Sequence, residues 1–376
     1  MTAVESTDVA LRVPFADLAM QTAEVRTELD GVWAHVLESH RFIGGDLVET
    51  FEREWAAYCG SAFAVSVANG TDSLHLILRA LGIGRGDEVV VPANTFVATA
   101  EAVVLAGAVP VFVDVLPDTL LIDPAQVEAA LTPRTAAIVP VHLFGQVAGM
   151  TSLVEIAGRA GVALVEDAAQ AHGAFHDGRR AGSIGIAGSF SFYPGKNLGA
   201  FGDGGAVTTS DAQLAARLRS LRDHGRALSD RYLHDHVGVN SRLDALQAGV
   251  LSVKLRHLDD WTGARRAHAA AYREQLPADV VSMVEETPWT PSVHHLAVVR
   301  TDRREQAMDG LAMRGVDTGI HYPVPCHLQE PYAAYSRGSL PVAEAAAEQI
   351  LSLPMFPHLT PDQVSHVCES VAAVLR

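Results

Sequence analysis

Basic residues are scarce in this sequence. It has 28 lysines and arginines against 44 aspartates and glutamates, which gives a formal net charge of −16 at pH 7. Proteins that bind nucleic acid or an anionic membrane surface present a basic face to it, so the charge balance argues against both partners. An anionic small molecule stays compatible with it, because such a ligand needs only a few local hydrogen-bond donors.

Cysteines are also few, and their arrangement excludes a disulfide framework. Cys59, Cys326 and Cys368 are odd in number and far apart in the chain, which indicates reduced thiols in a cytoplasmic protein. The His-Asp-His stretch at 234–236 lacks the spacing and the neighbouring Cys or Glu of a metal site. We therefore expect no metal.

Long apolar runs and internal repeats are absent as well. The most apolar run, AVVLAGAVPVFV at 102–113, contains Pro110 and is too short to cross a bilayer. The N-terminal stretch MTAVESTDVALRVPF has acidic residues early and no long apolar region, so we expect no signal peptide and no membrane partner. Without a repeat, a solenoid is excluded.

What the first two-thirds of the sequence does contain is a regular alternation of short valine-rich runs and amphipathic segments. The runs AFAVSV, DEVVVPA, VPVFVDV, AAIVPVHL and ALVEDA alternate with TDSLHLILRALG, TFVATAEAVVLAG, DPAQVEAAL and TSLVEIAGRAG. This alternation predicts βαβ units and an α/β fold with a mostly parallel sheet between two layers of helices.

The alternation of valine-rich runs and amphipathic segments ends near residue 242, and the change predicts a second domain. Residues 242–261 read as one long helix that connects the domains. Beyond it we expect a strand within 294–300, a helix at 304–315, a strand at 318–322 and a final helix at 361–376. The predicted division is a large domain at 1–250, with an N-terminal helical segment, and a smaller C-terminal α+β domain at 251–376.

One stretch, GSFSFYPGKNLGAFGDGGA at 188–206, holds a single lysine among small, aromatic and glycine residues. A phosphate-binding loop would need four residues between its glycines and a Ser or Thr after the lysine. Here six residues separate Gly188 from Gly195, and Asn197 follows Lys196, so that interpretation fails. A lysine that bonds covalently to pyridoxal phosphate needs a carboxylate for the ring nitrogen, a flat side chain on the ring and donors for the phosphate.

The sequence supplies a residue for each of these requirements at a predicted strand end. Asp167 closes the run ALVED, and Gly70 and Thr71 begin a helix whose N–H groups suit an anion. Phe96 follows another strand, and Ser191 lies five residues before the lysine. Each one alone also fits an ordinary structural role, such as a turn cap or a core side chain. Their joint occurrence is far more specific.

Over nearly its whole length, the chain resembles the nucleotide-sugar aminotransferases of the DegT type, which are pyridoxal-phosphate enzymes of fold type I. The matching segments are ANGTDSLHLILRALGIGRGDEVVVPANTFVATAEAV, VPVHLFGQ, VEDAAQAHGA, FSFYPGKNLGAFGDGGA, GVNSRLDALQA and HYPVPCHLQ. The resemblance implies a homodimer with active sites built from both subunits.

Carried over by position, the resemblance assigns the following roles. Lys196 and Asp167 are the catalytic residues, the first bonded to the cofactor and the second paired with its ring nitrogen. Cofactor contacts come from Phe96 and Gln170 at the ring, from Gly70, Thr71 and Ser191 at the phosphate, and from Asn240 of the second subunit. Tyr193, His321 and Tyr322 occupy places that line the sugar pocket in related 3-aminotransferases.

The motifs look most similar to those of enzymes that aminate a 3-keto-6-deoxyhexose carried on dTDP, with L-glutamate as the donor by analogy. Gln170 supports this subgroup, because relatives that aminate C-4 of the sugar usually have histidine there. Lys196 favours transamination over the family's 3-dehydratase branch, which has histidine in its place. The alternatives are an aminotransferase of a cyclitol or of a 4-keto nucleotide sugar, and a non-catalytic regulatory or binding protein on the same fold.

Overall fold

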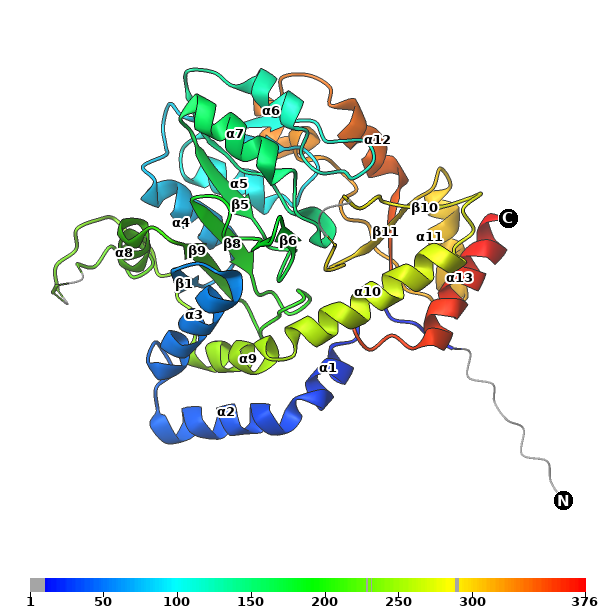
Figure 1. Cartoon of the computed structure of the whole chain (residues 1–376), viewed down its shortest axis with the longest axis horizontal. Coiled ribbons are helices and arrows are strands. Elements are labelled where there is room, and N and C mark those ends of the chain that lie inside the picture. The colour runs from blue at the N-terminus through cyan, green and yellow to red at the C-terminus, as the bar shows by residue number, and fades with distance from the viewer. Residues whose placement is uncertain (1–10, 228, 231, 288–290) are drawn as a thin grey trace.

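A seven-stranded sheet forms the centre of the larger part of the molecule (Figure 1). The computed structural model describes residues 11–227, 229–230, 232–287 and 291–376; residues 1–10, which carry most of the stretch where we expect no signal peptide, lie outside them. The strands are β1 (Phe63–Val67), β2 (Glu88–Pro92), β3 (Val109–Val113), β4 (Thr135–Ile138), β5 (Ala163–Asp167), β8 (Ala187–Ser191) and β9 (Gly205–Thr209). Their order is β1-β9-β8-β5-β4-β2-β3, and only β9 runs antiparallel to its neighbours. The predicted mostly parallel sheet is confirmed.

Helices cover both faces of this sheet, because its strands are apolar on both sides. The helices are α3 (Asp46–Cys59), α6 (Pro124–Ala130), α7 (Met150–Ala160) and α9 (Ala245–Leu255) on one face, and α4 (Gly70–Ala80), α5 (Ala98–Leu105) and α8 (Ala212–Leu221) on the other. Before them, α1 (Leu18–Glu24) and α2 (Arg26–Ser39) form the predicted N-terminal helical segment; α2 lies along α9. A short hairpin, β6 (Phe175–His176) and β7 (Arg179–Arg180), and the 3₁₀ turn η1 (Leu143–Gly145) complete this part.

Six strands of the large sheet end at the same edge. The parallel strands β2, β3, β4, β5 and β8 finish there, and β1, which is antiparallel to β9, points the same way as β8. Ligands of parallel α/β sheets bind beyond this carboxyl edge. Asp167 is the last residue of β5, Ser191 is the last of β8, and Gly70 begins α4 after β1. The fold therefore brings residues from distant parts of the sequence to one place.

The smaller part has its own sheet and core. Its antiparallel strands are β10 (Ser282–Met283), β11 (Ala297–Arg300) and β12 (Ile350–Leu353), with α10 (Leu258–Gln275), α11 (Arg304–Met313), α12 (Pro341–Gln349), α13 (Pro361–Leu375) and the 3₁₀ turns η2 (Cys326–Leu328) and η3 (Glu330–Tyr335) in the same half of the chain. The strand predicted within 294–300 and the helices predicted at 304–315 and 361–376 are confirmed. The domain boundary at residues 250 and 251 falls inside α9 and stays a prediction.

The single helix predicted at 242–261 is wrong, since the chain breaks at Arg256 and His257 into α9 and α10. The two helices have different partners: α9 packs on α2 and α3, whereas α10 crosses to α13 in the smaller part (Figure 1). At the break, Arg256 and His257 both bind the Glu28 carboxylate of α2. This contact between distant residues fixes the bend, and the helical periodicity of the sequence does not reveal it.

The strand predicted at 318–322 is also wrong. In that segment Gly319 alone forms a bridge, to Ser352 of β12. The chain then leaves the sheet, and His321 and Tyr322 reach the cavity described below. Because the neighbouring residues His321 and Tyr322 both line the cavity, this segment does not have the alternating sides of a strand.

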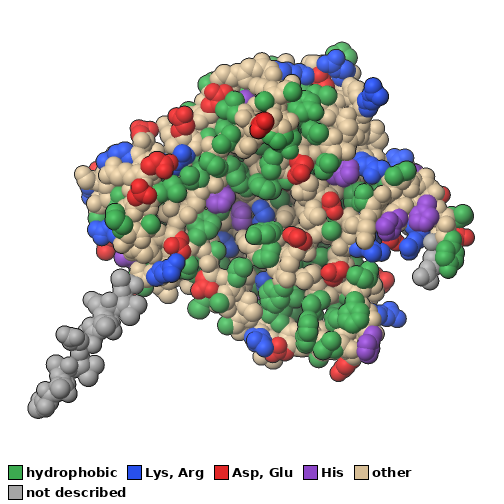
Figure 2. Space-filling model, turned by 180° about the vertical axis from the view of Figure 1, so that it is seen from behind, with side chains coloured by type: hydrophobic (Ala, Val, Ile, Leu, Met, Phe, Trp, Pro, Cys, Tyr) green, Lys and Arg blue, Asp and Glu red, His purple; other side chains and the backbone are tan. Residues whose placement is uncertain are grey.

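The surface agrees with the charge pattern of the sequence. On the face seen in Figure 2, Lys and Arg side chains are scattered among Asp and Glu and do not form a continuous patch. In the part of the chain that the structure describes, the helices are too short or too polar to cross a membrane, and three or more His, Cys, Asp or Glu side chains nowhere gather as metal ligands would.

Candidate active site

A cavity of about 670 Å³ opens at the carboxyl edge of the large sheet. Its lining includes the predicted site residues Gly70, Thr71, Phe96, Asp167, Gln170, Ser191, Tyr193, Lys196, His321 and Tyr322. Asn240 is the exception, since it is exposed and forms an isolated bridge with Asp223. The lining also contains residues of the N-terminal segment, of α10 and of the chain after β12, so both parts of the molecule build the cavity.

Lys196 lies in the turn that follows β8. Its backbone N–H donates to the carbonyl oxygen of Tyr193 at 2.8 Å, which closes the turn and turns the side chain into the cavity wall. The enclosed surroundings remove water from the amine and lower the pKa of Lys196 to about 8, although the nearby carboxylate of Asp167 acts in the opposite direction. About a tenth of this amine is therefore neutral, and nucleophilic, at pH 7, and more at higher pH.

Asp167 is held at the end of β5 by hydrogen bonds to both carboxylate oxygens. Thr99 Oγ1 donates to Oδ2 at 2.8 Å, and the backbone N–H of Ala169 donates to Oδ1 at 3.2 Å. Thr95 Oγ1 lies 2.9 Å from Thr99 Oγ1 and supports it. Burial raises the pKa of Asp167, and the two hydrogen bonds and the positive charge of Lys196 oppose this change. A cationic ligand atom beside Asp167 would keep the carboxylate ionised.

An anion site is formed where α4 approaches the end of β8. The side chain of Asn69 caps the helix by accepting from the N–H of Asp72 at 2.8 Å. The N–H groups of Gly70 and Thr71, in the first turn, have no intrahelical partner, and both residues line the cavity. A Cβ atom at Gly70 would lie 2.7 Å from Cβ of Ser191, so only glycine allows this close approach.

Aromatic and amide groups line another part of the cavity wall. Phe96 is 52% exposed, which excludes the core-packing alternative, and its ring centroid lies 5.5 Å from that of Tyr322. Gln170 is held in place because its Oε1 accepts from the N–H of Phe144 at 2.7 Å and its Nε2 donates to the Tyr322 hydroxyl at 3.1 Å. The Phe96 ring therefore offers a free face to a planar ligand.

Of the remaining predicted residues, His321 reaches the cavity from the segment before β12, and Tyr193 from the turn after β8. His321 stacks on Phe15 with a centroid distance of 5.6 Å, and its Nδ1 lies 2.9 Å from Ser352 Oγ. Burial and the nearby Lys196 charge lower the pKa of His321 to about 4, so its ring is neutral at pH 7. Tyr193 is largely exposed at the rim. Neutral hydrogen-bonding groups of this kind suit the hydroxyl groups of a sugar.

These features together fit pyridoxal phosphate. The wall of one cavity contains four groups: a lysine with a lowered pKa, a buried carboxylate, an exposed aromatic ring, and a helix N-terminus at which only glycine fits. They correspond to the groups that the cofactor requires at its aldehyde, ring nitrogen, ring face and phosphate. The roles of the individual residues stay predictions.

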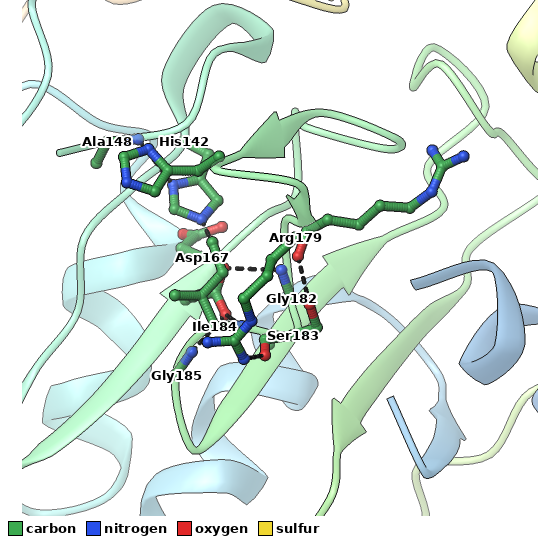
Figure 3. A network of polar contacts seen from close by, with 12 residues as sticks. His142, Ala148, Asp167, Arg179, Gly182, Ser183, Ile184 and Gly185 are labelled. Carbon is green, nitrogen blue, oxygen red and sulfur yellow. Dashed lines mark hydrogen bonds and ion pairs between the residues drawn. The ribbon is translucent and has the colours of Figure 1, made fainter. Parts of the chain in front are cut away.

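A buried hydrogen-bond network supports the strand that carries Asp167 (Figure 3). The carboxylate of Glu166, fully buried, lies 2.9 Å from His142 Nε2 and accepts the N–H groups of Gly182, Ile184 and Gly185 at 2.7–2.8 Å. The N–H of Ala148 donates to His142 Nδ1, which leaves the proton on Nε2 to face the carboxylate. Despite burial, these contacts lower the pKa of Glu166.

Replacing Glu166 with glutamine is expected to lower the free energy of unfolding by about 3 kcal/mol at pH 7, because the amide NH₂ would face backbone donors. Since the folded-state pKa is lowered, the stability from the carboxylate is present above its usual value of 4.5 and is lost as the pH falls through the lowered value. Urea unfolding at pH 7 and below pH 4 measures both effects. Glu128→Gln, at an exposed ion pair with Arg159, is the control and should change little. If Glu166→Gln had the same free energy of unfolding as the wild type at pH 7, the stabilising role of Glu166 would be contradicted.

Several cavity residues are not identifiable from the sequence. Thr99 orients Asp167, but its sequence context marks it only weakly. It is a hydroxyl residue near the start of a helix, about one turn after Thr95. Arg265 of α10 and Gln21 of α1 also line the cavity. Nothing in their local sequence distinguishes them from other polar residues on amphipathic helices.

The sequence and the fold of this chain are similar to those of known proteins. The DegT/DnrJ/EryC1/StrS aminotransferase family matches residues 24–372. The chain is 50% identical over 363 residues to a dTDP-3-amino-3,4,6-trideoxy-alpha-D-glucose transaminase of Streptomyces venezuelae, covering 96% of this chain and 95% of that protein. It is also 50% identical over 365 residues to the erythromycin biosynthesis sensory transduction protein EryC1 of Saccharopolyspora erythraea, covering 96% and 99%. The crystal structure of S. venezuelae DesV in complex with a ketimine intermediate superimposes with a TM-score of 0.93 at 49% identity, covering 97% of this chain and 99% of that one.

Proposed function

The chain belongs to the DegT/DnrJ/EryC1/StrS aminotransferase family, whose members depend on pyridoxal phosphate, and from this premise we propose that it aminates C-3 of a 3-keto-6-deoxyhexose carried on dTDP, with L-glutamate as the amino donor. The observation that carries the proposal is the presence of Lys196 and Asp167 in the wall of one cavity. The name of the S. venezuelae relative, a 3-amino-sugar transaminase, supports the choice of ring position. The reaction would belong to deoxysugar biosynthesis for an antibiotic, in the cytoplasm.

Each residue has a distinct task in this reaction. When bound, pyridoxal phosphate supplies an electron sink that makes the hydrogen on the substrate's reacting carbon acidic. Lys196 Nζ would take the proton from the reacting carbon of the amino donor, and in the second half of the reaction it would return a proton to C-3 of the sugar. A pKa of about 8 lets the amine act in both directions near neutral pH. Asp167 would stabilise a proton on the cofactor's ring nitrogen, and Thr99 and Ala169 fix the direction of its carboxylate.

The binding groups divide between cofactor and sugar. Gly70, Thr71 and Ser191 would hold the phosphate, because their donors meet where α4 approaches β8. Phe96 would stack on the ring and Gln170 would contact the ring hydroxyl. For the sugar, we assign Tyr193, His321 and Tyr322, whose neutral polar groups lie toward the rim and the smaller part of the molecule.

A substrate screen tests the proposal. The purified enzyme is supplied with pyridoxal phosphate, L-glutamate and dTDP-linked 3-keto or 4-keto hexoses, and formation of 2-oxoglutarate is followed. We expect turnover to be fastest with a 3-keto-6-deoxyhexose. Turnover of 4-keto sugars alone would refute the proposed substrate. So would a preference for free cyclitol ketones when these compete with dTDP-sugars.

A regulatory protein on the same fold is the second candidate, because the name of the EryC1 relative describes a sensory transduction protein. The joint presence of Lys196 and Asp167 in the cavity favours catalysis, since a purely regulatory protein has no need of a reactive lysine beside a carboxylate. Bound cofactor without conversion of any amino donor would favour the regulatory role.

The proposal includes a homodimer in which Asn240 serves the active site of a second copy. Asn240 is exposed and outside the cavity of its own chain. Large apolar side chains are exposed on α2 and just after it, namely Trp33, Leu37, Phe42 and Ile43. Exposed apolar groups of this size are typical of a surface that another chain covers.

Replacing Asn240 with alanine is expected to weaken cofactor retention about tenfold, because one hydrogen bond to a charged phosphate is lost. The measurement is the amount of pyridoxal phosphate left after gel filtration, together with the mass in solution by sedimentation. His236→Ala, at another exposed position before Asn240, should retain cofactor as the wild type does. A fully active monomer, or unchanged retention in Asn240→Ala, would contradict the shared site.

A further inference from the structure

Arg265 is a buried cation in the cavity wall whose partners are neutral. Its side chain is 5% exposed, and its Nη1 donates to the carbonyl oxygens of Met355 at 2.9 Å and His294 at 3.2 Å. Its Nε is buried without a hydrogen-bond partner. In the described part of the chain, carbonyl oxygens are thus the acceptors of this guanidinium, and its charge is not balanced by a carboxylate.

Such an arrangement is costly unless a ligand completes it. An unpaired buried charge costs several kcal/mol, and proteins retain such groups mainly at functional sites. Burial lowers the pKa of Arg265 to about 10, so the guanidinium is still charged at pH 7. Burial lowers the pKa of the cavity residue His295, and the charges of Lys196 and Arg265 lower it further, so both cations act on this part of the cavity.

A second unsatisfied group, Gln21 of α1, approaches the cavity from the neighbouring helix. It is 3% exposed, lines the cavity, and its Oε1 has no hydrogen-bond partner. The indole N–H of Trp261 donates to Glu24 Oε2 at 2.9 Å and ties α1 to α10. Gln21 precedes Glu24 by about one turn, and Arg265 follows Trp261 by about one turn. Both unsatisfied side chains thus lie about one turn from this contact and line the same cavity.

We propose that Arg265 binds a carboxylate of the amino donor, with the amide of Gln21 beside it; this deepens the proposed function and rests on it. The planar guanidinium matches a carboxylate in shape and charge. An amide can turn its oxygen toward the donor's ammonium group or its NH₂ toward the carboxylate. The sugar diphosphate is the competing anion. It is joined to a bulky nucleoside that needs room toward solvent, whereas Arg265 lies at the buried wall near Lys196.

Equilibrium binding tests the proposal independently of turnover. The cofactor-loaded protein is titrated with 2-oxoglutarate, and separately with dTDP, by calorimetry. Arg265→Met is expected to bind 2-oxoglutarate about ten- to a hundredfold more weakly, because charge-assisted hydrogen bonds to the carboxylate are lost, and to bind dTDP as the wild type does. The matched control is Arg266→Met. Arg266 is the next residue on α10, donates to the Ser292 carbonyl at 2.9 Å and does not line the cavity, so binding of both probes should stay within about twofold.

The outcomes separate this proposal from the proposed function. The carboxylate site is overturned if Arg265→Met binds 2-oxoglutarate like the wild type. It is also overturned if this variant loses dTDP binding instead. If Arg265→Met does not fold, Gln21→Leu decides: binding weakened about threefold or more supports the site, and unchanged binding overturns it. A wild type that binds 2-oxoglutarate through Arg265 but aminates no nucleotide-linked keto sugar refutes the proposed function and leaves the site intact.

Discussion

Replacing Lys196 with alanine is expected to reduce turnover by at least about a thousandfold and to abolish the visible absorbance of the lysine-bound cofactor. The reason is that one amine performs two tasks, holding the cofactor and moving the proton. Its lowered pKa of about 8 keeps it competent for both near neutral pH. Absorbance spectra of the reconstituted protein and the rate of 2-oxoglutarate formation measure the two losses.

Lys254 offers a matched control for this prediction. It is a second buried lysine whose pKa is lowered to about 8, but its Nζ donates to the carbonyl oxygen of Gly199 at 2.8 Å and it does not line the cavity. Lys254→Met should keep the visible band of the bound cofactor. If Lys196→Ala retained the band and Lys254→Met lost it, the assignment of the reactive lysine would be wrong.

Replacing Asp167 with asparagine is expected to lower the turnover number by about a hundredfold or more while the protein stays folded. Asparagine has nearly the same shape and can still accept the hydrogen bond from Thr99, but a neutral amide cannot stabilise a proton on the cofactor's ring nitrogen. Steady-state kinetics with circular dichroism measure the effect. The exposed Asp30→Asn, which removes an ion pair with Arg26 on α2, should leave turnover unchanged. Asp167→Asn with more than a tenth of wild-type activity would contradict the role.

The cavity is largely predictable from the sequence where local features mark strand ends. Asp167 and Ser191 end valine- or phenylalanine-containing strands, and Gly70 follows an Asn that caps a helix. Because parallel strands deliver their carboxyl ends to one edge, a residue's place at a strand end is sufficient to predict its neighbours across the sheet. This geometry explains why residues more than a hundred positions apart could be assigned to one site.

The features that the sequence does not reveal depend on contacts between distant residues. The break between α9 and α10 is fixed by Glu28, over two hundred residues away along the chain, and so the helical periodicity continues across it. Arg265 and Arg266 are adjacent and chemically identical, and only the packing of α10 decides which one enters the cavity. Likewise, the pairing of Glu166 with His142 requires two strands to be adjacent.

The most direct test of the account is to locate the covalent bond to the cofactor. The protein reconstituted with pyridoxal phosphate is reduced with sodium borohydride, which makes the bond to the lysine permanent, and the digested peptides are analysed by mass spectrometry. The account predicts a pyridoxyl phosphate group on Lys196, in the peptide that contains PGKN. Modification of Lys254 instead, or a protein that takes up no reducible cofactor, would contradict it.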